Sequence, residues 1–376
     1  MTFRPRLFLS HLPAAGAERV FTTLATLWRR EGLDARLGLW SKTGPLVEQL
    51  PPDLPIDVVG DGPWAPTSAS IEQSGAAVAR WMEASEGSVL MTGMPWANAA
   101  GAAARRHGAI HGQPWRFVWS ERTEPNALYA DMPEAERRVL DGYGRVGARL
   151  ADAGTAVSTR CADEMVDRWG WYRARITPLF NPLRMPTGDG RVHPWLERPR
   201  THRCALNVAR LSHEKGHDVL LRAWALLPPT LADLRCVVLG EGPERAKLES
   251  LAHSLDLEDR VHFAGFGWDV AAALHACDLF VFPSLYEGLP NAVIEALVAG
   301  CPIVSTGQGR GGGDILRGGA LGRLVAEGDV EGLAQAIVDT YAHPLPPADP
   351  EIDRFDPKTV AARYRAVLEN AGSPIR

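Results

Sequence analysis

The chain has 376 residues, which at roughly 150 residues per domain is enough for two domains. Its net charge of -5 argues against a nucleic-acid-binding protein, which would usually carry a basic domain. No apolar run approaches the ~18 residues needed to cross a bilayer, and the first twenty residues have too short an apolar core for a signal peptide. The five cysteines lack metal-ligand spacing, and three of them, Cys204, Cys236 and Cys301, suit buried free thiols. We therefore expect a cytoplasmic protein, at most peripheral on the inner membrane surface.

Taken in chain order, the first half alternates short apolar strands with helices. A strand at 6–12 leads through a turn to a helix over 20–32, and further helices are predicted at 96–108 and 134–154. The other strands expected in this half are 35–41, 87–93, 115–121 and 156–160. This alternation is typical of a parallel, doubly wound sheet covered by helices.

A stretch rich in Pro, Gly and charge, 184–200, interrupts the pattern, and we interpret it as a linker. The alternation then restarts and continues to a last helix at 356–372. The strands expected in this half are 201–210, 234–242, 261–266, 278–284 and 301–306. The sequence thus predicts two α/β domains, 1–183 and 201–350, facing each other across a cleft.

Residues 287–295, EGLPNAVIE, place two glutamates around the start of a helix between two apolar strands. Pro290 suits the first helical position and Gly300 suits a left-handed helix end. Ligands of open α/β sheets bind outside the carboxyl ends of the strands, where Glu287 and Glu295 are expected to lie. Two carboxylates there can accept hydrogen bonds from a sugar or ribose diol. Either glutamate alone could equally balance the helix dipole or lie on the surface.

A second strand-to-helix turn, within 207–224, carries two cations. Arg210 and Lys215 flank the turn, five residues apart. A guanidinium that can fork onto phosphate oxygens and a mobile ammonium suit a leaving diphosphate. Taken alone, the two could also be solvated surface charges.

In combination, these blocks resemble the signature of the family-4 retaining glycosyltransferases of the GT-B fold. In that signature, two glutamates with seven residues between them follow a PS…EG.P loop, as they do within 283–295. The resemblance is strong across about residues 205–340 and includes a glycine-rich loop at 307–316, where Gly312 and Gly313 would allow close approach to the donor. It departs at Ala209, where a glycine is commoner, and at Asp314, where a glutamate is usual.

The resemblance implies how the domains and residues act. The first domain would bind the acceptor, 201–350 would bind the nucleotide-sugar donor, and the helix within 351–376 would return to the first domain. Glu287 would contact the donor sugar and Glu295 the nucleotide ribose, while Arg210 and Lys215 would stabilise charge on the leaving diphosphate without a metal or other cofactor. The further donor-binding residues would be Gly288, Leu289 and Asn291.

The first domain resembles the family less closely. The segment AAGAERV at 14–20 is similar to the family's glycine-rich first turn, where the backbone contacts the donor phosphate and the acceptor. Only Gly16 in this segment matches the glycine pair usual there, so only Gly16 is assigned that role. Many members carry a histidine after a middle strand, whereas this chain has VWSERTEPN at 118–126, as in a polysaccharide-building subset. Glu121 and Arg122 are therefore candidates for facing the acceptor or the donor.

The function predicted from these features is retaining transfer of a sugar, with UDP the nucleotide expected by family habit. The acceptor would be a hydroxyl of a glycan, a lipid-linked glycan or a small molecule. Two rivals stay open. One is a nucleotide-sugar 2-epimerase that needs no acceptor, and the other is a non-catalytic nucleotide-sugar-binding subunit, with which the missing histidine is compatible.

Two stretches, 104–116 and 167–175, combine aromatic and basic residues. In the first, Arg105, Arg106 and Arg116 could meet phosphates at a membrane surface. Aromatic packing in the core with solvated charge explains the same composition. Contact with a membrane surface is thus one of two interpretations.

Overall fold

The computed structural model describes residues 3–13, 16–60, 67–83, 88–112, 114–130, 132–183, 185, 188–307, 310–343, 345, 349 and 351–372. The chain forms two compact units. Unit 1 comprises Met1–Pro182 with Arg354–Arg376, and unit 2 comprises Leu183–Asp353.

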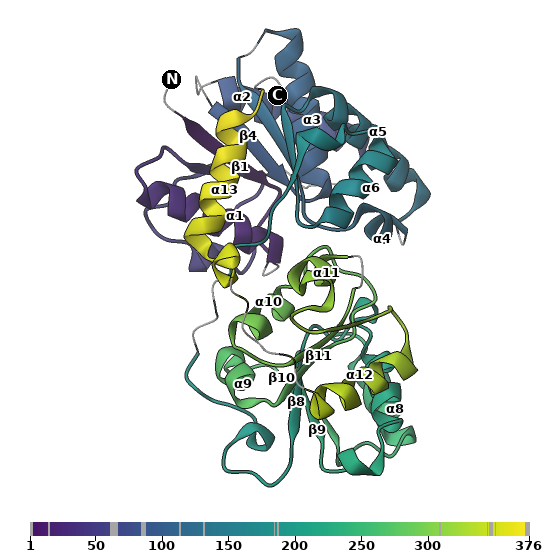
Figure 1. The fold of residues 1–376 in the computed structure, drawn as a ribbon. Helices are drawn as coiled ribbons and strands as arrows, with labels where there is room; N and C mark the ends of the chain where they lie inside the picture. Colours follow the sequence, from purple (N-terminus) through teal and green to yellow (C-terminus); the bar gives the residue numbers. More distant parts are fainter. Residues whose placement is uncertain are drawn as a thin grey trace. The chain divides into compact units, whose positions relative to one another are not determined.

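Unit 1 is built on a seven-stranded parallel sheet in the order β3-β2-β1-β4-β5-β6-β7 (Figure 1). Its strands are β1 (Arg4–Leu9), β2 (Arg36–Leu39), β3 (Ile56–Val58), β4 (Ser88–Gly93), β5 (Arg116–Glu121), β6 (Ala153–Ala156) and β7 (Ile176–Pro178). The strand order reverses between β1 and β4, as in doubly wound sheets. The strand expected at 156–160 lies earlier in the chain, because Ser158 leaves the sheet and accepts a hydrogen bond from Cys161 N (3.2 Å), which caps the next helix.

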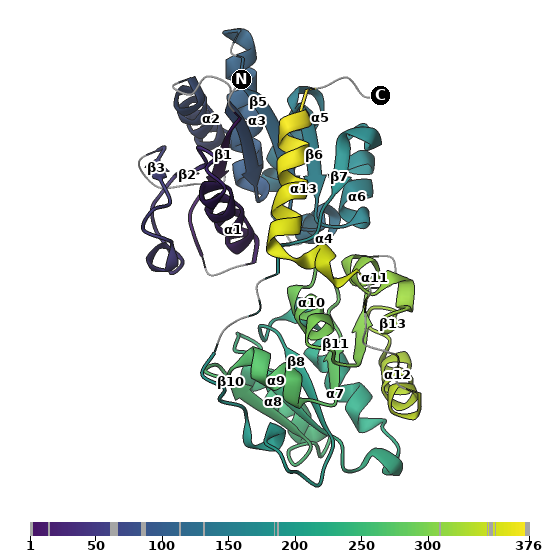
Figure 2. The same ribbon diagram turned by 60° about the vertical axis from the view of Figure 1, so that its left-hand side comes forward.

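The helices of unit 1 lie on both faces of its sheet. They are α1 (Gly16–Arg30), α2 (Ser68–Glu83), α3 (Pro95–Ile110), α4 (Pro125–Ala130), α5 (Glu134–Leu150), α6 (Thr159–Trp169) and α13 (Pro357–Asn370). Figure 2 shows α1 and α13 side by side. Tyr364 and Leu368 of α13 are buried in the same core as Phe21 of α1, and the Trp28 indole donates to the carbonyl of Ala361 (3.1 Å). The expected return of the C-terminal helix to the first unit is confirmed.

Unit 2 has a six-stranded parallel sheet in the order β10-β9-β8-β11-β12-β13. Its strands are β8 (Cys204–Val208), β9 (Arg235–Leu239), β10 (Val261–Gly265), β11 (Leu279–Phe282), β12 (Ile303–Thr306) and β13 (Arg323–Val325). Its helices are α7 (His217–Ala225), α8 (Arg245–Ser254), α9 (Val270–Ala276), α10 (Asn291–Val298), α11 (Gly311–Ile315) and α12 (Val330–Ala342). Here the order reverses between β8 and β11.

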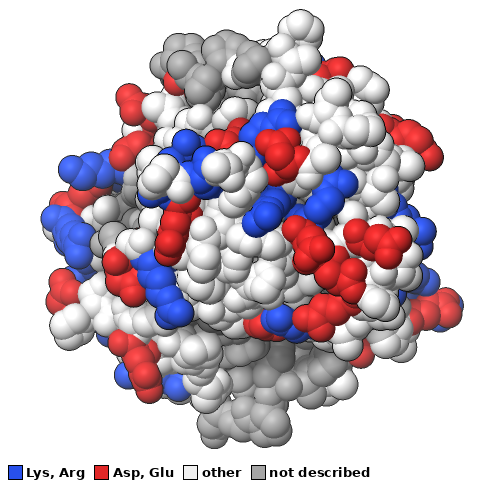
Figure 3. Space-filling model, turned by 90° about the horizontal axis from the view of Figure 1, so that it is seen from below, with Lys and Arg blue, Asp and Glu red and all other residues white. Residues whose placement is uncertain are grey.

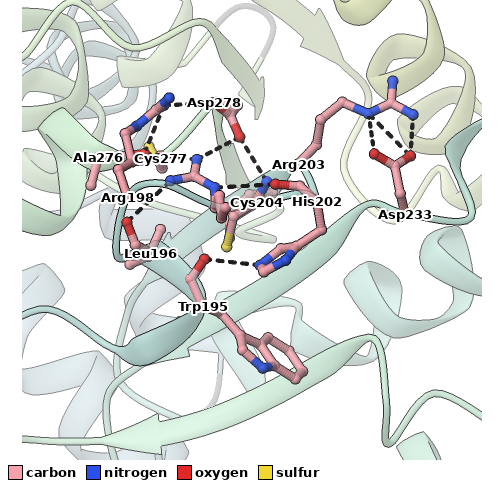
Figure 4. A network of polar contacts seen from close by, with 12 residues as sticks. Trp195, Leu196, Arg198, His202, Arg203, Cys204, Asp233, Ala276, Cys277 and Asp278 are labelled. Atoms are coloured by element: carbon pink, nitrogen blue, oxygen red, sulfur yellow. Dashed lines mark hydrogen bonds and ion pairs between the residues drawn. The ribbon is translucent and has the colours of Figure 1, made fainter.

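Residues 188–200, within the segment interpreted as a linker, belong to unit 2 and are bonded to it. Asp269 accepts a hydrogen bond from Gly190 N (2.8 Å). Asp278, just before β11, accepts from Arg198 (2.9 Å) and from the backbone N–H of Cys204 (2.8 Å), which are labelled in Figure 4. It also accepts from Arg200 (2.6 Å). The amino ends of β8 and β11 and the segment leading to them therefore share one carboxylate.

The two tryptophans of 167–175 pack inside unit 1, whereas Tyr172 is 63% exposed. Trp169 and Trp171 are buried, with their rings 5.5 and 6.1 Å from the ring of Trp119. Arg168 is paired with Asp141 (2.6 Å). This geometry favours core packing over membrane contact for Trp169, Trp171 and Arg168.

The basic residues of 104–116 are likewise engaged within unit 1. Arg105 lies 3.7 Å from Asp152, Arg106 lies 2.5 Å from Glu72, and Arg116 donates to the carbonyl of Ala371 (2.8 Å). Within the described ranges, no helix is long and apolar enough to span a membrane. Basic and acidic side chains lie near one another on the face drawn in Figure 3.

Candidate functional site

The predicted donor-site residues converge at the point in unit 2 where the strand order reverses. Arg210 and Lys215 follow β8, and Glu287 follows β11, which is the neighbouring strand. In open parallel sheets, this switch point at the carboxyl ends of the strands is where ligands bind. Two segments that are far apart in sequence thus supply charged side chains to the same edge of the sheet.

Lys215 and Glu287 form an ion pair between their side chains, which are 19% and 24% exposed. The loops that carry them are also joined through their backbones. The carbonyl of Glu214 accepts hydrogen bonds from Leu285 N (2.8 Å) and from the Ser284 hydroxyl (2.8 Å). The pair is therefore held by the fold as well as by its own charges.

Gly216 allows this close approach of the two loops. It has a φ of +63°, in the left-handed region, and a Cβ at this position would lie 2.1 Å from the carbonyl oxygen of Pro283. Any other residue here would be strained and would also push the loops apart. The Lys-Gly pair of the sequence motif thus has a structural reason.

A buried polar pair lies behind Lys215. The His217 ring nitrogen Nε2 is 3.1 Å from Asn207 Oδ1, and the Asn207 amide donates to the carbonyl of Val281 in β11 (2.9 Å). Burial, aided by the charge of Lys215, lowers the pKa of His217 to about 4. His217 is therefore neutral at neutral pH and acts in joining β8 to β11.

Arg210 is held more loosely than Lys215. Its side chain is 68% exposed, with its guanidinium 3.7 Å from Glu214 and 3.4 Å from the Ser212 hydroxyl. Burial acts to raise the pKa of Glu214, but the Ser212 hydroxyl and the charges of Lys215 and Arg210 bring it below its ordinary value. Arg210 is therefore freer to reorient than Lys215, which is paired with Glu287.

Helix α10 starts one residue later than predicted. Pro290 is its N-cap residue and Asn291 its first helical residue, while Gly300 is left-handed (φ +76°) after the helix end, as expected. Leu289 is buried, and Glu295 lies one turn into the helix. Glu287, Gly288 and Leu289 precede the N-terminus of α10, where backbone N–H groups are free of helical bonds.

The glycine-rich loop after β12 packs on the loop that precedes α10. A Cβ on Gly311 would lie 2.4 Å from the carbonyl oxygen of Gly288, and one on Gly312 would lie 2.7 Å from that of Thr306. These two glycines are thus required by the fold itself. The expectation that Gly312 and Gly313 let a donor approach stays a prediction.

A small pocket opens at this edge, and it contains residues that the sequence did not single out. Its lining includes Tyr286, Glu287, Thr306, Arg310 and Glu327. Arg310 Nε lies 3.0 Å from Glu327 Oε1, so a second cation–carboxylate pair sits beside the first. Arg310 lies in the loop at 307–316, where the sequence motif indicates glycines and an acidic residue but no role for the arginine.

The candidates of unit 1 occupy different surroundings. Gly16 begins α1. Glu121, at the end of β5, is 1% exposed, and its carboxylate accepts from the Trp119 indole (3.1 Å), from Arg122 N (3.2 Å) and from the Thr123 hydroxyl (3.4 Å). Burial raises the pKa of Glu121 to about 7, although these hydrogen bonds act to lower it. The structure therefore gives Glu121 an internal role, and does not bring it to the surface.

The two doubly wound units, with this charged edge on the second, are those of a GT-B protein. HepE of Anabaena, solved with UDP, matches 98% of this chain and 100% of its own at a TM-score of 0.78 and 22% identity. The lipopolysaccharide outer core galactosyltransferase WaaB matches 98% of this chain and 99% of its own at a TM-score of 0.77 and 13% identity. At these identities the likeness shows the fold alone.

Sequence comparisons define the family. The family model described as glycosyl transferases group 1 matches residues 193–349. The lipopolysaccharide core biosynthesis glycosyltransferase LpsE of Rhizobium meliloti is 34% identical over 240 residues, which are 59% of this chain and 67% of that protein. The chain therefore belongs to the group 1 glycosyltransferases, as the sequence motifs predict.

Other relatives match over a shorter stretch. The 2-deoxystreptamine N-acetyl-D-glucosaminyltransferase of Niallia circulans is 33% identical over 147 residues, 38% of each chain. A Campylobacter jejuni enzyme whose name gives a diphospho-undecaprenol-linked sugar as its acceptor is 33% identical over 132 residues, 35% of each chain. The chain thus spans little more than a third of the length of these two relatives.

Proposed function

We propose that the chain is a family-4 retaining glycosyltransferase that moves a sugar from a UDP-sugar to a hydroxyl of a glycan or lipid-linked glycan. The observation that carries this proposal is the Lys215–Glu287 pair at the switch point of unit 2. It places a cation suited to a diphosphate in contact with a carboxylate suited to sugar hydroxyls. The names of LpsE and of the Campylobacter relative support the acceptor class, and the HepE complexes with UDP and with UDP-glucose support the donor.

The reaction would proceed on one face of the donor sugar. The acceptor oxygen bonds to the anomeric carbon as the bond from that carbon to the diphosphate breaks, and the hydroxyl proton passes to the leaving diphosphate. Lys215 and Arg210 stabilise the negative charge that grows on the diphosphate. Such electrostatic stabilisation is usually the largest single contribution to the rate enhancement. Glu287 would hold the sugar hydroxyls and Glu295 the ribose diol.

Lys215 would exchange partners when the donor binds. With Glu287 beside it, the ammonium is already neutralised, so an incoming diphosphate competes with that carboxylate for it. Once Lys215 turns to the phosphate, Glu287 is released to accept hydrogen bonds from the sugar. A donor that carries both diphosphate and sugar therefore satisfies both members of the pair.

The proposal is tested first by ligand binding and then by product analysis. A ligand at 100 times its dissociation constant should stabilise the protein by about 2.7 kcal/mol, so UDP and UDP-sugars should raise its melting temperature. NMR of the product should show the anomeric configuration of the donor, and activity should persist in excess EDTA because side chains neutralise the diphosphate. An epimerised nucleotide sugar formed without an acceptor, or donor binding with no turnover, would favour one of the rivals instead.

A further inference from the structure

Four charged side chains, one after each of four neighbouring strands of unit 2, alternate in sign along the edge of its sheet. In strand order, Lys215 follows β8, Glu287 follows β11, Arg310 follows β12 and Glu327 follows β13. Neighbouring strands lie about 4.8 Å apart, so charges on adjacent strand ends can meet. They form two ion pairs, Lys215 with Glu287 and Arg310 with Glu327. The proposed reaction uses the first pair and gives the second no role.

The two ion pairs share one pocket. Glu287 of the first pair lines it, as do Arg310 and Glu327 of the second. These three side chains are 24%, 25% and 27% exposed, so a ligand can reach them from solvent. Arg310 Nε lies 3.0 Å from Glu327 Oε1, and the pocket has room for about one water molecule. A group of that size would meet a guanidinium and two carboxylates at once.

Two neutral polar groups that line the same pocket are engaged with the backbone. The Ser284 hydroxyl donates to the carbonyl of Glu214 (2.8 Å), and the Thr306 hydroxyl donates to the carbonyl of Ser284. Hydrogen bonds to charged groups are stronger than those between neutral groups. The guanidinium is therefore the strongest donor that a ligand meets in this pocket, and the two carboxylates are the strongest acceptors.

The size and charge of the pocket define the group that fits it. A hydroxyl is about as large as a water molecule, and it can accept from a guanidinium while donating to a carboxylate. An acetamido group is larger than the space. An ionised carboxylate would compete with Glu327 for Arg310 and would face two groups of its own charge, which is unfavourable. The charges of the two ion pairs also sum to zero, so the pocket has no net charge that would attract an ion.

We infer that Arg310 and Glu327 bind one hydroxyl of the donor sugar and thereby select which sugar is used. This inference rests on the proposed function, in which Glu287 contacts the sugar, and deepens it by naming the sugar class. Because Glu287 is also a wall of the pocket, a sugar held by it lies beside the second ion pair. The class is a sugar with a free hydroxyl at the position that faces the pocket, and not an acetamido or carboxylate group there.

The test compares donors that differ at one position of the sugar. Calorimetry gives the affinities of UDP, UDP-glucose, UDP-galactose, UDP-N-acetylglucosamine and UDP-glucuronate for wild type, Arg310→Met and Glu327→Gln. Each UDP-sugar affinity is divided by that of UDP, so that effects on the nucleotide cancel. Asp233→Asn is the matched control, because Asp233 is likewise paired with an arginine, Arg203 (2.9 Å), but precedes β9 at the opposite edge of the sheet. Melting temperatures are measured alongside.

We expect wild type to bind UDP-glucose or UDP-galactose best and at least one of the other UDP-sugars about 10-fold more weakly. Arg310→Met and Glu327→Gln should each lower the affinity for the best UDP-sugar about 10-fold, as for a lost hydrogen bond to a charged group, and so remove that discrimination. The affinity for UDP itself should stay within about twofold of wild type. Asp233→Asn should keep the wild-type order of donors.

Three results would overturn the inference. Wild type that binds all four UDP-sugars equally, or binds the acetamido or carboxylate sugar best, has no hydroxyl pocket of this kind. Discrimination that persists in both variants would mean that other residues select the sugar. Affinities for UDP and UDP-sugars that fall together with the melting temperature would make the Arg310–Glu327 pair structural. Wild type that binds neither UDP nor any UDP-sugar would refute the proposed function, and the inference with it.

Discussion

Lys215 and Glu287 form an ion pair across the β8–β11 switch point although they lie 72 positions apart in the chain. The pair brings the two motifs of the second half into one contact. It also leaves the ligand-free protein with a cation that a carboxylate already neutralises.

Replacing Glu287 with glutamine should therefore separate nucleotide binding from sugar handling. Without its carboxylate partner, Lys215 is free for a diphosphate, and repulsion of the phosphate is removed, so UDP should bind more tightly. Turnover of the UDP-sugar should fall, because an amide accepts weaker hydrogen bonds from sugar hydroxyls than a carboxylate does. Calorimetry with UDP and a steady-state assay measure the two effects. Weaker UDP binding would show that Lys215 does not meet the diphosphate.

Gly216→Ala should lower the free energy of unfolding by about 2–4 kcal/mol. The alanine would be strained by its left-handed φ, and its Cβ would clash with the Pro283 carbonyl oxygen. Gly190→Ala is the matched control, since Gly190 has a φ of +80° and no atom within 4 Å of the added Cβ. It should cost only about 1–2 kcal/mol. Equal losses in urea unfolding would show that the β8 and β11 loops are not held together here.

The sequence predicts the position of a side chain best when that position is set by nearby residues in the chain. The glutamates at 287 and 295 and the cations at 210 and 215 were found because a strand, a turn and a helix start follow one another within each motif. Arg310 and Glu327 were missed as a pair because β13 has only three residues and was not predicted, so the sequence offered no neighbour for β12.

Burial was harder to predict than secondary structure. Strands of a parallel sheet are covered on both faces, so β5 carries no alternation that would show which way Glu121 points. Arg122 reads as an ordinary polar residue just after a strand. It is buried, and its guanidinium donates to Asn181 Oδ1 and to the Tyr364 hydroxyl of α13, at the far end of the chain. The tryptophans of 167–175 were ambiguous for the same reason.

Glu121 should make stability depend on pH. Its pKa in the folded protein, about 7, lies above the ordinary 4.5, so the fold favours the protonated carboxyl. The contribution is fully present below about pH 4.5 and is lost as the pH rises through about 7, by about 3 kcal/mol. Urea unfolding at several pH values should show a shallower decline in Glu121→Gln than in wild type. Parallel profiles would mean that Glu121 ionises normally.

Arg210→Ala and Lys215→Ala should each act mainly on turnover, by about 10²–10³, because both cations meet charge that grows in the transition state. Arg210→Lys should restore little, since a point charge cannot fork onto two phosphate oxygens. The double variant should lose less than the product of the two single effects, because both act on one diphosphate. Steady-state rates on folded variants measure this. Both single variants keeping more than about a third of wild-type turnover would place the diphosphate elsewhere.

The most direct test of the donor site is a calorimetric titration of UDP into wild type, Lys215→Ala and Lys247→Ala. UDP carries the full charge that develops on the leaving group, so its affinity reports the cation contact without any chemistry. Lys247, on α8, is 64% exposed and paired with Glu244, which makes it a control for loss of a lysine charge. We predict that Lys215→Ala binds UDP about 10- to 100-fold more weakly, while Lys247→Ala matches wild type. Equal UDP affinity in all three proteins would contradict it.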